Sequence, residues 1–405
     1  MFDILVIGAG AAGYMAAIIA KRENPELKIA ILEKTGKVLG KVKISGGGRC
    51  NLTHNCLKIS ELSKAYPRGG RFLKKCFPLW SVQETLDFFN GLGVETYAQE
   101  DGRMFPTSNT SETVVDALQN EAKGIGIKVI LNQGLNGLEP TDNGWTANTR
   151  DQEMTAKSII LAMGGFPKEH EYNFLKNLDV QIAEPVPSLF TFNIADYYLH
   201  ELAGVSVPEA WVKIDGLKEW HIGACLVTHW GLSGPAILRS SAVHALELNK
   251  KRYNFTVRVN WLAKTEAEYD EIWAELNKTD GAKNIKNINM GDIPQRLWEY
   301  ILVKTGMTMD TNLAEVSRAD KNRLKENLLQ MPFEVKGKTT FKEEFVTAGG
   351  IELSEINKQM QIIAHPGLYA CGEILNIDGI TGGYNFQAAW TTGYLAGLNA
   401  AGYCK

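Results

Sequence analysis

The 405-residue sequence lacks several features that would assign it to a functional class at once. Its charge is nearly balanced, with 43 Lys and Arg residues against 46 Asp and Glu residues, so the average charge gives no case for nucleic-acid binding. Its six cysteines form no Cys-x-x-Cys pair, which argues against a zinc ribbon, a dithiol redox site and a disulfide-rich secreted domain. The seven histidines are too dispersed for a convincing ligand cluster, and we expect no metal. The sequence therefore predicts a cytoplasmic protein of two or three domains, since 405 residues exceed one compact core.

Long hydrophobic runs are also missing. The apolar run from Ile4 to Ala20 is short for a membrane span and is interrupted by Gly8, Gly10 and Gly13. Asp3 precedes it, where a secretory signal has basic residues. We therefore expect neither a signal peptide nor a membrane association.

The first 33 residues carry a complete dinucleotide-binding pattern. An apolar strand at 2–7 leads into Gly8-x-Gly10-x-x-Gly13, a helix follows, and a second apolar strand at 28–32 ends at Glu33. The three glycines suit a tight turn, close approach of backbone to a pyrophosphate, and packing of helix on strand, in that order. The acidic residue suits an adenosine ribose and disfavours a 2′-phosphate. The pattern predicts FAD or NAD in preference to NADP and does not separate those two.

A second glycine cluster spans residues 43–53 and contains Ser45, three consecutive glycines, Arg49 and Asn51. Exposed backbone donors beside a cation suit a phosphate or the edge of a flavin ring. A flexible loop is the alternative. A further strand, at 158–162, runs into Gly164, and no second Gly-x-Gly-x-x-Gly follows it, so we expect no second dinucleotide domain.

The balanced charge conceals a strongly basic segment, residues 34–75, with eleven Lys and Arg residues and one acid, Glu61. Two interpretations stay open. The first is cofactor phosphate binding plus an ordinary solvated surface; the second is a docking surface for a polyanion such as RNA.

The pattern changes near residue 185. Alternating runs at 190–194, 211–214 and 253–259 predict strands of an antiparallel unit, and residues 265–329 have helical character. Within this unit, Thr228-His229 precedes a glycine-rich turn, which makes His229 a candidate site residue with a structural role as the alternative.

The C-terminal part returns to glycine-rich strands. One strand ends at Gly372-Glu373, and Gly382-Gly383 precede an alanine-rich helix at 388–400. A glycine turn at a helix N-terminus repeats the anion-binding arrangement of the N-terminal motif.

Together these motifs resemble the BaiN/RdsA (YhiN-like) family of FAD-dependent flavoproteins, and the resemblance covers essentially the whole chain. It implies an α/β fold in which a Rossmann-type FAD-binding domain of the glutathione-reductase type is split by an inserted antiparallel β-barrel-like domain that carries a helical subdomain. The implied ranges are 1–187 and 344–405 for the FAD-binding domain, 188–262 and 330–343 for the barrel, and 263–329 for the helical subdomain.

The resemblance selects FAD over NAD and implies which residues contact it. The N-terminal motif takes the pyrophosphate, Glu33 the ribose, the second glycine cluster the phosphates and ribityl chain, and the C-terminal glycines the ribityl chain and ring. The predicted FAD-binding residues are Gly8, Gly10, Ala11, Ala12, Gly13, Glu33, Lys34, Lys41, Ser45, Gly46, Gly47, Arg49, Asn51, Gly164, Gly372, Glu373, Gly382, Gly383, Tyr384 and Asn385. The chain departs from the family pattern at 166–174 and 359–363, which leaves any inherited substrate open.

We therefore expect an FAD-dependent oxidoreductase in which NAD(P)H, a transient donor, reduces the flavin and hydride then passes to a conjugated C=C bond. The neighbouring carbon needs a proton donor. Cys50 is the first candidate because Arg49 and the glycine turn can tune its pKa, with ring or core packing as the alternative; His229 is the second. The basic segment favours a ribosomal RNA uridine as substrate. A small-molecule enone reductase, a flavin oxidase and a non-catalytic flavin- or RNA-binding protein are the alternatives.

Overall fold

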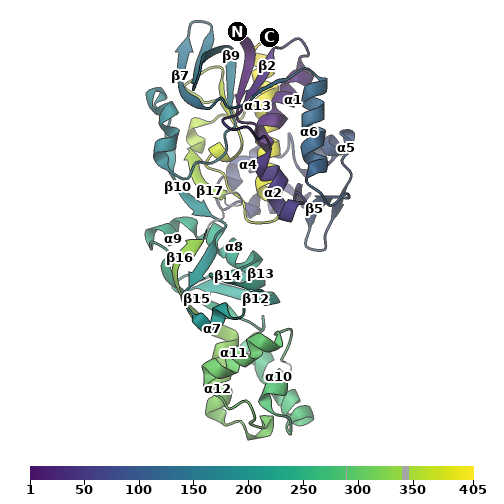
Figure 1. Cartoon of the computed structure of the whole chain (residues 1–405), viewed down its shortest axis with the longest axis vertical. Coiled ribbons are helices and arrows are strands. Elements are labelled where there is room, and N and C mark those ends of the chain that lie inside the picture. Colours follow the sequence, from purple (N-terminus) through teal and green to yellow (C-terminus); the bar gives the residue numbers. More distant parts are fainter. Residues whose placement is uncertain (289, 340–345) are drawn as a thin grey trace. The chain divides into compact units, whose positions relative to one another are not determined.

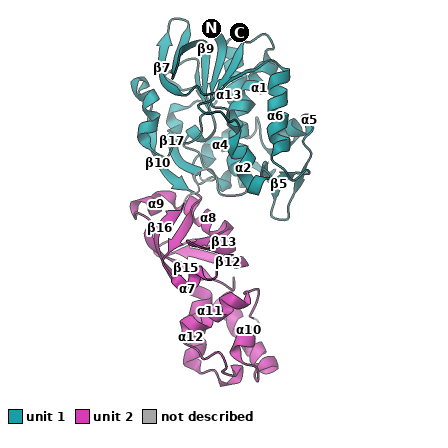
Figure 2. Ribbon diagram, in the orientation of Figure 1, with its two compact units in different colours: residues 1–188, 341–405 teal, residues 189–340 magenta. Residues whose placement is uncertain are grey.

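The computed structural model describes residues 1–288, 290–339 and 346–405, which form two compact units (Figure 2). Unit 1 comprises residues 1–188 and 341–405, and unit 2 comprises residues 189–340. Unit 2 is thus an insertion within unit 1. The predicted second domain boundary, at 343/344, lies outside the described residues.

A seven-stranded sheet forms the centre of unit 1 (Figure 1). Its parallel strands are β6 (Lys128–Ile130), β2 (Ile29–Leu32), β1 (Phe2–Ile7), β9 (Glu153–Leu161) and β18 (Leu368–Ala370). The antiparallel strands β8 (Gly144–Thr149) and β7 (Leu135–Thr141) extend it from the N-terminal half of β9. The strands predicted at 2–7, 28–32 and 158–162 are confirmed, because continuous apolar runs fit a parallel sheet that is buried on both faces.

Helices from the two ends of the chain pack together on this sheet. The helix α1 (Ala11–Glu23) lies beside α13 (Tyr384–Tyr403) in Figure 1. A Cβ on Gly397 of α13 would lie 2.2 Å from the carbonyl oxygen of Ala16, so only glycine permits this approach. The predicted C-terminal helix begins four residues earlier than expected, directly after Gly383.

The remainder of unit 1 surrounds the helix pair. Its helices are α2 (Gly40–Gly48), α3 (Ile59–Leu62), α4 (Gly70–Cys76), α5 (Val82–Gly91) and α6 (Glu112–Gly124). A three-stranded sheet contains β3 (Thr53–His54), β5 (Arg103–Pro106) and β4 (Thr96–Ala98), and β10 (Ile182–Ser188) pairs with β17 (Val346–Ile351).

Unit 2 is a closed antiparallel barrel with a helical extension. The barrel order is β11 (Thr191–Ile194), β14 (Gly231–Ser233), β13 (His221–Thr228), β12 (Ser206–Ile214), β15 (Asn254–Asn260) and β16 (Met331–Thr339). Between β15 and β16 the chain forms α10 (Glu266–Asp280), α11 (Gln295–Thr305) and α12 (Arg318–Gln330). Shorter helices are α7 (Tyr197–His200), α8 (Pro235–Val243) and α9 (Ala245–Lys250). The predicted fold class is therefore confirmed.

Over the described ranges, no helix combines the length and the apolar character needed to cross a membrane.

Candidate functional site

Three glycine-containing turns meet at one edge of the parallel sheet. Strand register pairs Ile7 of β1 and Ala370 of β18 with Leu161 of β9, so the three strands end side by side. The turns that follow contain Gly8, Gly164 and Gly372. In open α/β sheets, ligands bind outside the carboxyl ends of the strands. The structure thus brings together three segments that are far apart in the sequence.

The first turn has the shape that a pyrophosphate requires. A Cβ on Gly8 would lie 2.4 Å from the carbonyl oxygen of Ala162, and one on Gly13 would lie 1.9 Å from the carbonyl oxygen of Gly8. Both glycines are therefore needed for packing. A Cβ on Gly10 would meet no atom within 4 Å, so the space before the first turn of α1 is open. Backbone N–H groups at the start of a helix lack intrahelical acceptors, and this opening fits a diphosphate.

Glu33 lies where the predicted adenosine end of the site begins. Its Oε2 accepts a hydrogen bond from the Ala9 amide at 3.1 Å, and its Oε1 accepts from the Thr35 amide and hydroxyl, both at 2.9 Å. These bonds hold the carboxylate against the glycine turn. The Lys34 Nζ lies 5.6 Å from the centre of the Phe166 ring, so the divergent segment 166–174 contributes to this end of the site.

The second glycine cluster is a broken helix and not the flexible loop that was the alternative to an anion-binding turn. Within α2, Ser45, Gly46 and Gly47 have non-helical backbone angles. Arg49 donates to the Gly46 carbonyl at 3.2 Å, and its guanidinium lies 4.2 Å from the centre of the Phe105 ring. These contacts fix the cluster, so its amides lie in a defined geometry.

Side chains from both ends of the chain meet at this cluster. Lys41 Nζ lies 2.6 Å from Glu373 Oε2, and Glu373 Oε1 accepts from the Thr347 amide at 2.9 Å. In the amide orientation that satisfies both its groups, Asn51 donates to the Thr53 carbonyl at 3.1 Å and accepts from the Gly383 amide at 3.0 Å. These contacts therefore join the segment from Lys41 to Asn51 with Glu373 and Gly383 from the C-terminal part of the chain.

The start of α13 brings the predicted Tyr384 against His54, a residue that sequence reasoning missed. His54 stacks on Tyr384 with ring centres 4.5 Å apart, and its Nδ1 lies 3.0 Å from the Gly382 carbonyl. A detectable signal was present, because His54 directly extends the second glycine cluster. The Asn385 amide closes the preceding loop on Gly379 through two hydrogen bonds, of 2.8 and 3.0 Å, and its contact with FAD stays a prediction.

Cys50 lies inside unit 1, with 0% of its surface exposed. Burial raises the pKa of its thiol to about 12, against a smaller lowering by a hydrogen bond with Ser45. This environment keeps the proton on sulfur, and it fits the packing alternative better than proton donation.

His229 lies in unit 2, in the exposed turn between β13 and β14. The preceding Thr228 shapes the turn, since its hydroxyl accepts from the Trp230 amide and donates to the Gly231 carbonyl, both at 3.2 Å. The catalytic role of His229 stays a prediction.

The expectation that the histidines are dispersed is wrong for one pair. His221 and His244 face each other in unit 2, and Glu219 lies beside them. The expectation failed because 23 residues separate the two histidines in the sequence, and they meet where α8 packs against β13.

Comparisons with known proteins agree with this geometry. The chain is 28% identical to a 3-dehydro-bile acid delta(4,6)-reductase of Clostridium scindens, over 99% of each chain. It is 26% identical to a ribosomal RNA dihydrouridine synthase of Haemophilus influenzae, over 98% of this chain and 97% of the relative. It shares its fold with a 3-ketosteroid-delta4-(5alpha)-dehydrogenase from Rhodococcus jostii RHA1, with a TM-score of 0.54 at 13% identity over 99% and 96% of the two chains. The model of the HI0933-like protein Rossmann domain matches residues 2–399, and the chain belongs to this HI0933-like family.

Proposed function

We propose that the protein is an FAD-dependent oxidoreductase that passes hydride from NAD(P)H through the flavin to a conjugated C=C bond, and that it works in the cytoplasm. The observation that carries this proposal is the meeting of glycine turns from both ends of the chain at the edge formed by β1, β9 and β18. FAD is a long cofactor, and a site of this kind offers separate groups for each part of it.

We assign the predicted FAD-binding residues by their places in this site. The first-turn amides of α1 would hold the pyrophosphate and Glu33 would bind the adenosine ribose. Lys41 and Asn51 would bind the phosphates and ribityl chain, and the turn before α13 would contact the ring. When bound, FAD supplies the two-electron chemistry, and the chain's own groups bind and orient it.

The names of the relatives support the reaction type. A delta(4,6)-reductase and a dihydrouridine synthase both saturate a ring C=C bond next to a carbonyl group. The shared chemistry is hydride addition to the β-carbon and protonation of the α-carbon. We propose this reaction class here and keep His229 as the candidate proton donor, since the Cys50 thiol is buried and holds its proton tightly.

The two relatives imply different substrates, and the charges of the basic segment bear on the choice. Acids from outside the segment pair with three of its cations: Glu373 with Lys41, Glu112 with Lys43, and Asp378 with Arg68. The net positive charge around the folded basic segment is thus smaller than the count of its residues in the sequence indicates. Exposed cations remain on α4, at Arg71, Lys74 and Lys75. We propose ribosomal RNA as the substrate on this account, with a small-molecule enone as the second candidate.

The test is anaerobic reduction of the purified, FAD-loaded protein by NADH and by NADPH. We expect one donor to bleach the flavin absorbance, and we expect addition of ribosomal RNA that lacks dihydrouridine to restore it. Restoration by a 3-oxo-Δ4,6 bile acid alone would favour the small-molecule substrate. Restoration by oxygen alone would identify an oxidase. A protein that holds no FAD, or FAD that neither donor reduces, contradicts the proposal.

The substrate also predicts a salt response. Binding of ribosomal RNA through cations weakens steeply as salt rises, because bound counterions are released. The double variant Lys74→Glu with Lys75→Glu is expected to weaken RNA binding and to leave reduction by NAD(P)H unchanged. Arg150→Glu, at an exposed position outside the basic segment, is the matched control.

A further inference from the structure

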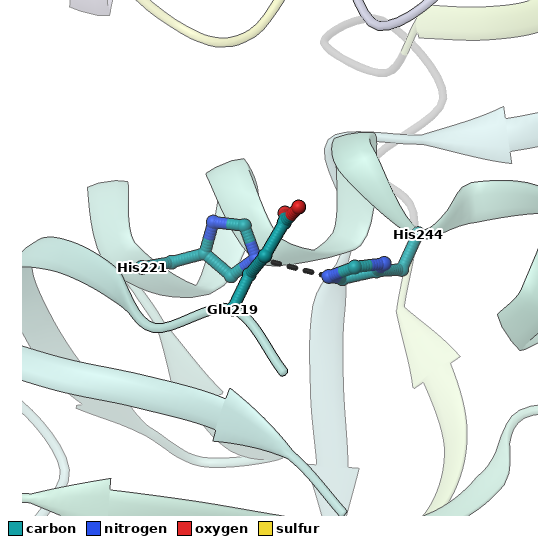
Figure 3. A group of neighbouring side chains, drawn as sticks. All are labelled: Glu219, His221 and His244. Carbon is teal, nitrogen blue, oxygen red and sulfur yellow. Dashed lines mark hydrogen bonds between the residues drawn. The ribbon is translucent and has the colours of Figure 1, made fainter. Parts of the chain in front are cut away.

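Two histidines of unit 2 lie with their ring nitrogens facing each other. His221 is the first residue of β13, and His244 lies at the junction between α8 and α9. Their Nε2 atoms are 3.1 Å apart, and both side chains are buried, with 6% and 9% of the residues exposed. Glu219 lies in the connection between β12 and β13, and a ligand atom from each of the three residues lies within 4.8 Å of the other two (Figure 3).

We propose that Glu219, His221 and His244 bind a divalent transition-metal ion, with Zn²⁺ as the reference ion. Two imidazoles and one carboxylate are a common ligand combination for Zn²⁺, and a water completes the tetrahedron. This proposal does not depend on the proposed reaction, because the whole site lies within unit 2.

The distances fit this ion. With Zn–N bonds of about 2.0–2.1 Å and tetrahedral angles, two nitrogen ligands of one ion stand roughly 3.3–3.4 Å apart. The observed 3.1 Å therefore requires the two rings to separate by only a few tenths of an ångström. Glu219 is exposed, so its side chain has the freedom to move its oxygen to the same separation.

The protonation states also fit. Burial lowers the pKa of both histidines, and burial together with the neighbouring His244 and Arg239 lowers the pKa of His221 to about 4. Burial thus disfavours the charged form of both rings, and the neutral imidazole is the form that binds metals. Within the pair, one Nε2–H donates to the other Nε2. Metal binding needs both lone pairs, so the donor ring moves its proton to Nδ1 through solvent and no net proton is released.

The surrounding charges are mixed. Glu219 and Glu247 both act on His244 and favour a cation there. Arg239 acts on His221 in the opposite sense, and its guanidinium donates to the Ile222 carbonyl at 3.2 Å. Two carboxylates thus oppose one guanidinium, and we expect binding of one ion that is weaker in the absence of the Glu219 carboxylate.

The test is titration of the full, FAD-loaded and metal-stripped protein with Co²⁺, followed by competition with Zn²⁺. Tetrahedral Co²⁺ has visible ligand-field bands, and thiolate ligands add a near-ultraviolet charge-transfer band. This separates the proposed site from a site built by any of the six cysteines. We expect one Co²⁺ per chain, the visible bands, no thiolate band, and displacement by Zn²⁺.

Variants decide the ligands. His221→Gln and His244→Gln are each expected to abolish the visible bands, and Glu219→Gln is expected to weaken Co²⁺ binding at least tenfold. His170→Gln, at an exposed position of unit 1, is the matched control. Because Glu219 is exposed, its variant tests the site even if a histidine variant fails to fold. Any of three results overturns the proposal: no visible Co²⁺ bands, the presence of a thiolate band, or Co²⁺ binding in Glu219→Gln that equals that of the unchanged protein.

Discussion

Loss of the largely covered guanidinium of Arg68 should destabilise unit 1 more than the loss of an exposed guanidinium. The Arg68 side chain, 12% exposed, pairs through two nitrogens with the carboxylate of Asp378, which is 0% exposed. Ser188, the last residue of unit 1 before the insertion, donates to the same carboxylate at 2.9 Å. In Arg68→Ala the Asp378 carboxylate stays buried and loses the hydrogen bonds from Arg68, while the Ser188 hydroxyl still donates to it. Removal of one partner from a buried ion pair costs about 3–5 kcal/mol.

The pH dependence of this loss follows from the same contacts. Burial raises the pKa of Asp378 above its ordinary value, and Arg68 opposes that rise. Without Arg68 the pKa rises further, so the variant gains stability when the carboxyl is protonated and loses it as the pH rises through the folded-state pKa. We therefore expect the free energies of unfolding of Arg68→Ala and the unchanged protein to differ less at about pH 5.5 than at about pH 8.

The assay is denaturant unfolding of the FAD-loaded protein at both pH values, followed by flavin fluorescence, which reports on unit 1. Arg71→Ala, at an exposed position three residues away, is the control and is expected to change the free energy of unfolding by less than about 0.5 kcal/mol. The reasoning would be refuted if both variants lowered the free energy of unfolding equally, or if Arg68→Ala lowered it more at the lower pH than at the higher pH.

Three further predictions concern the FAD site. Gly13→Ala places a Cβ 1.9 Å from the Gly8 carbonyl oxygen and is expected to lower the melting temperature of the apoprotein. The Cβ of Gly10→Ala meets no atom within 4 Å, so this variant is expected to weaken FAD binding alone. Melting curves and FAD titrations of both variants separate the two effects. Lys41→Ala breaks the ion pair of the half-exposed Lys41 with Glu373 and is expected to lower the free energy of unfolding by less than about 1 kcal/mol. The variant is also expected to release FAD faster, and an unchanged rate of FAD release would contradict a contact between Lys41 and the cofactor. The buried Cys50 thiol is expected to resist alkylation in the folded protein, and Cys50→Ala is expected to retain turnover, as checked by mass spectrometry and steady-state assay.

The sequence allowed the nucleotide-binding half of the fold to be predicted because its signals are local. The turn around Gly8–Gly13 and the carboxylate of Glu33 stand within 33 residues of each other, and their spacing reflects a single supersecondary unit. The alternation in 190–194 and 253–259 likewise predicted strands of the barrel, because its inward and outward faces differ in polarity.

The features that escaped prediction depend on contacts between distant residues. Residue type and spacing do not show that Asp378 meets Arg68, because 310 positions separate them. The pairing of His221 with His244 depends on the packing of α8 against β13, and the inward position of Cys50 depends on where the helix around 40–48 breaks. Arg49 was expected to tune Cys50, but its guanidinium stacks on Phe105 instead.

The division of unit 1 into two stretches of chain has a consequence for biosynthesis. Domains fold as units while the ribosome delivers the chain from its N-terminus. Unit 2 is complete when residue 340 has been made, whereas unit 1 still awaits β18 and α13. Until then the C-terminal half of β9 has an unpaired edge, and the face of α1 that receives Gly397 is uncovered. The inserted barrel can therefore fold before unit 1 is complete, and we expect flavin binding to require α13, whose first residues belong to the proposed site.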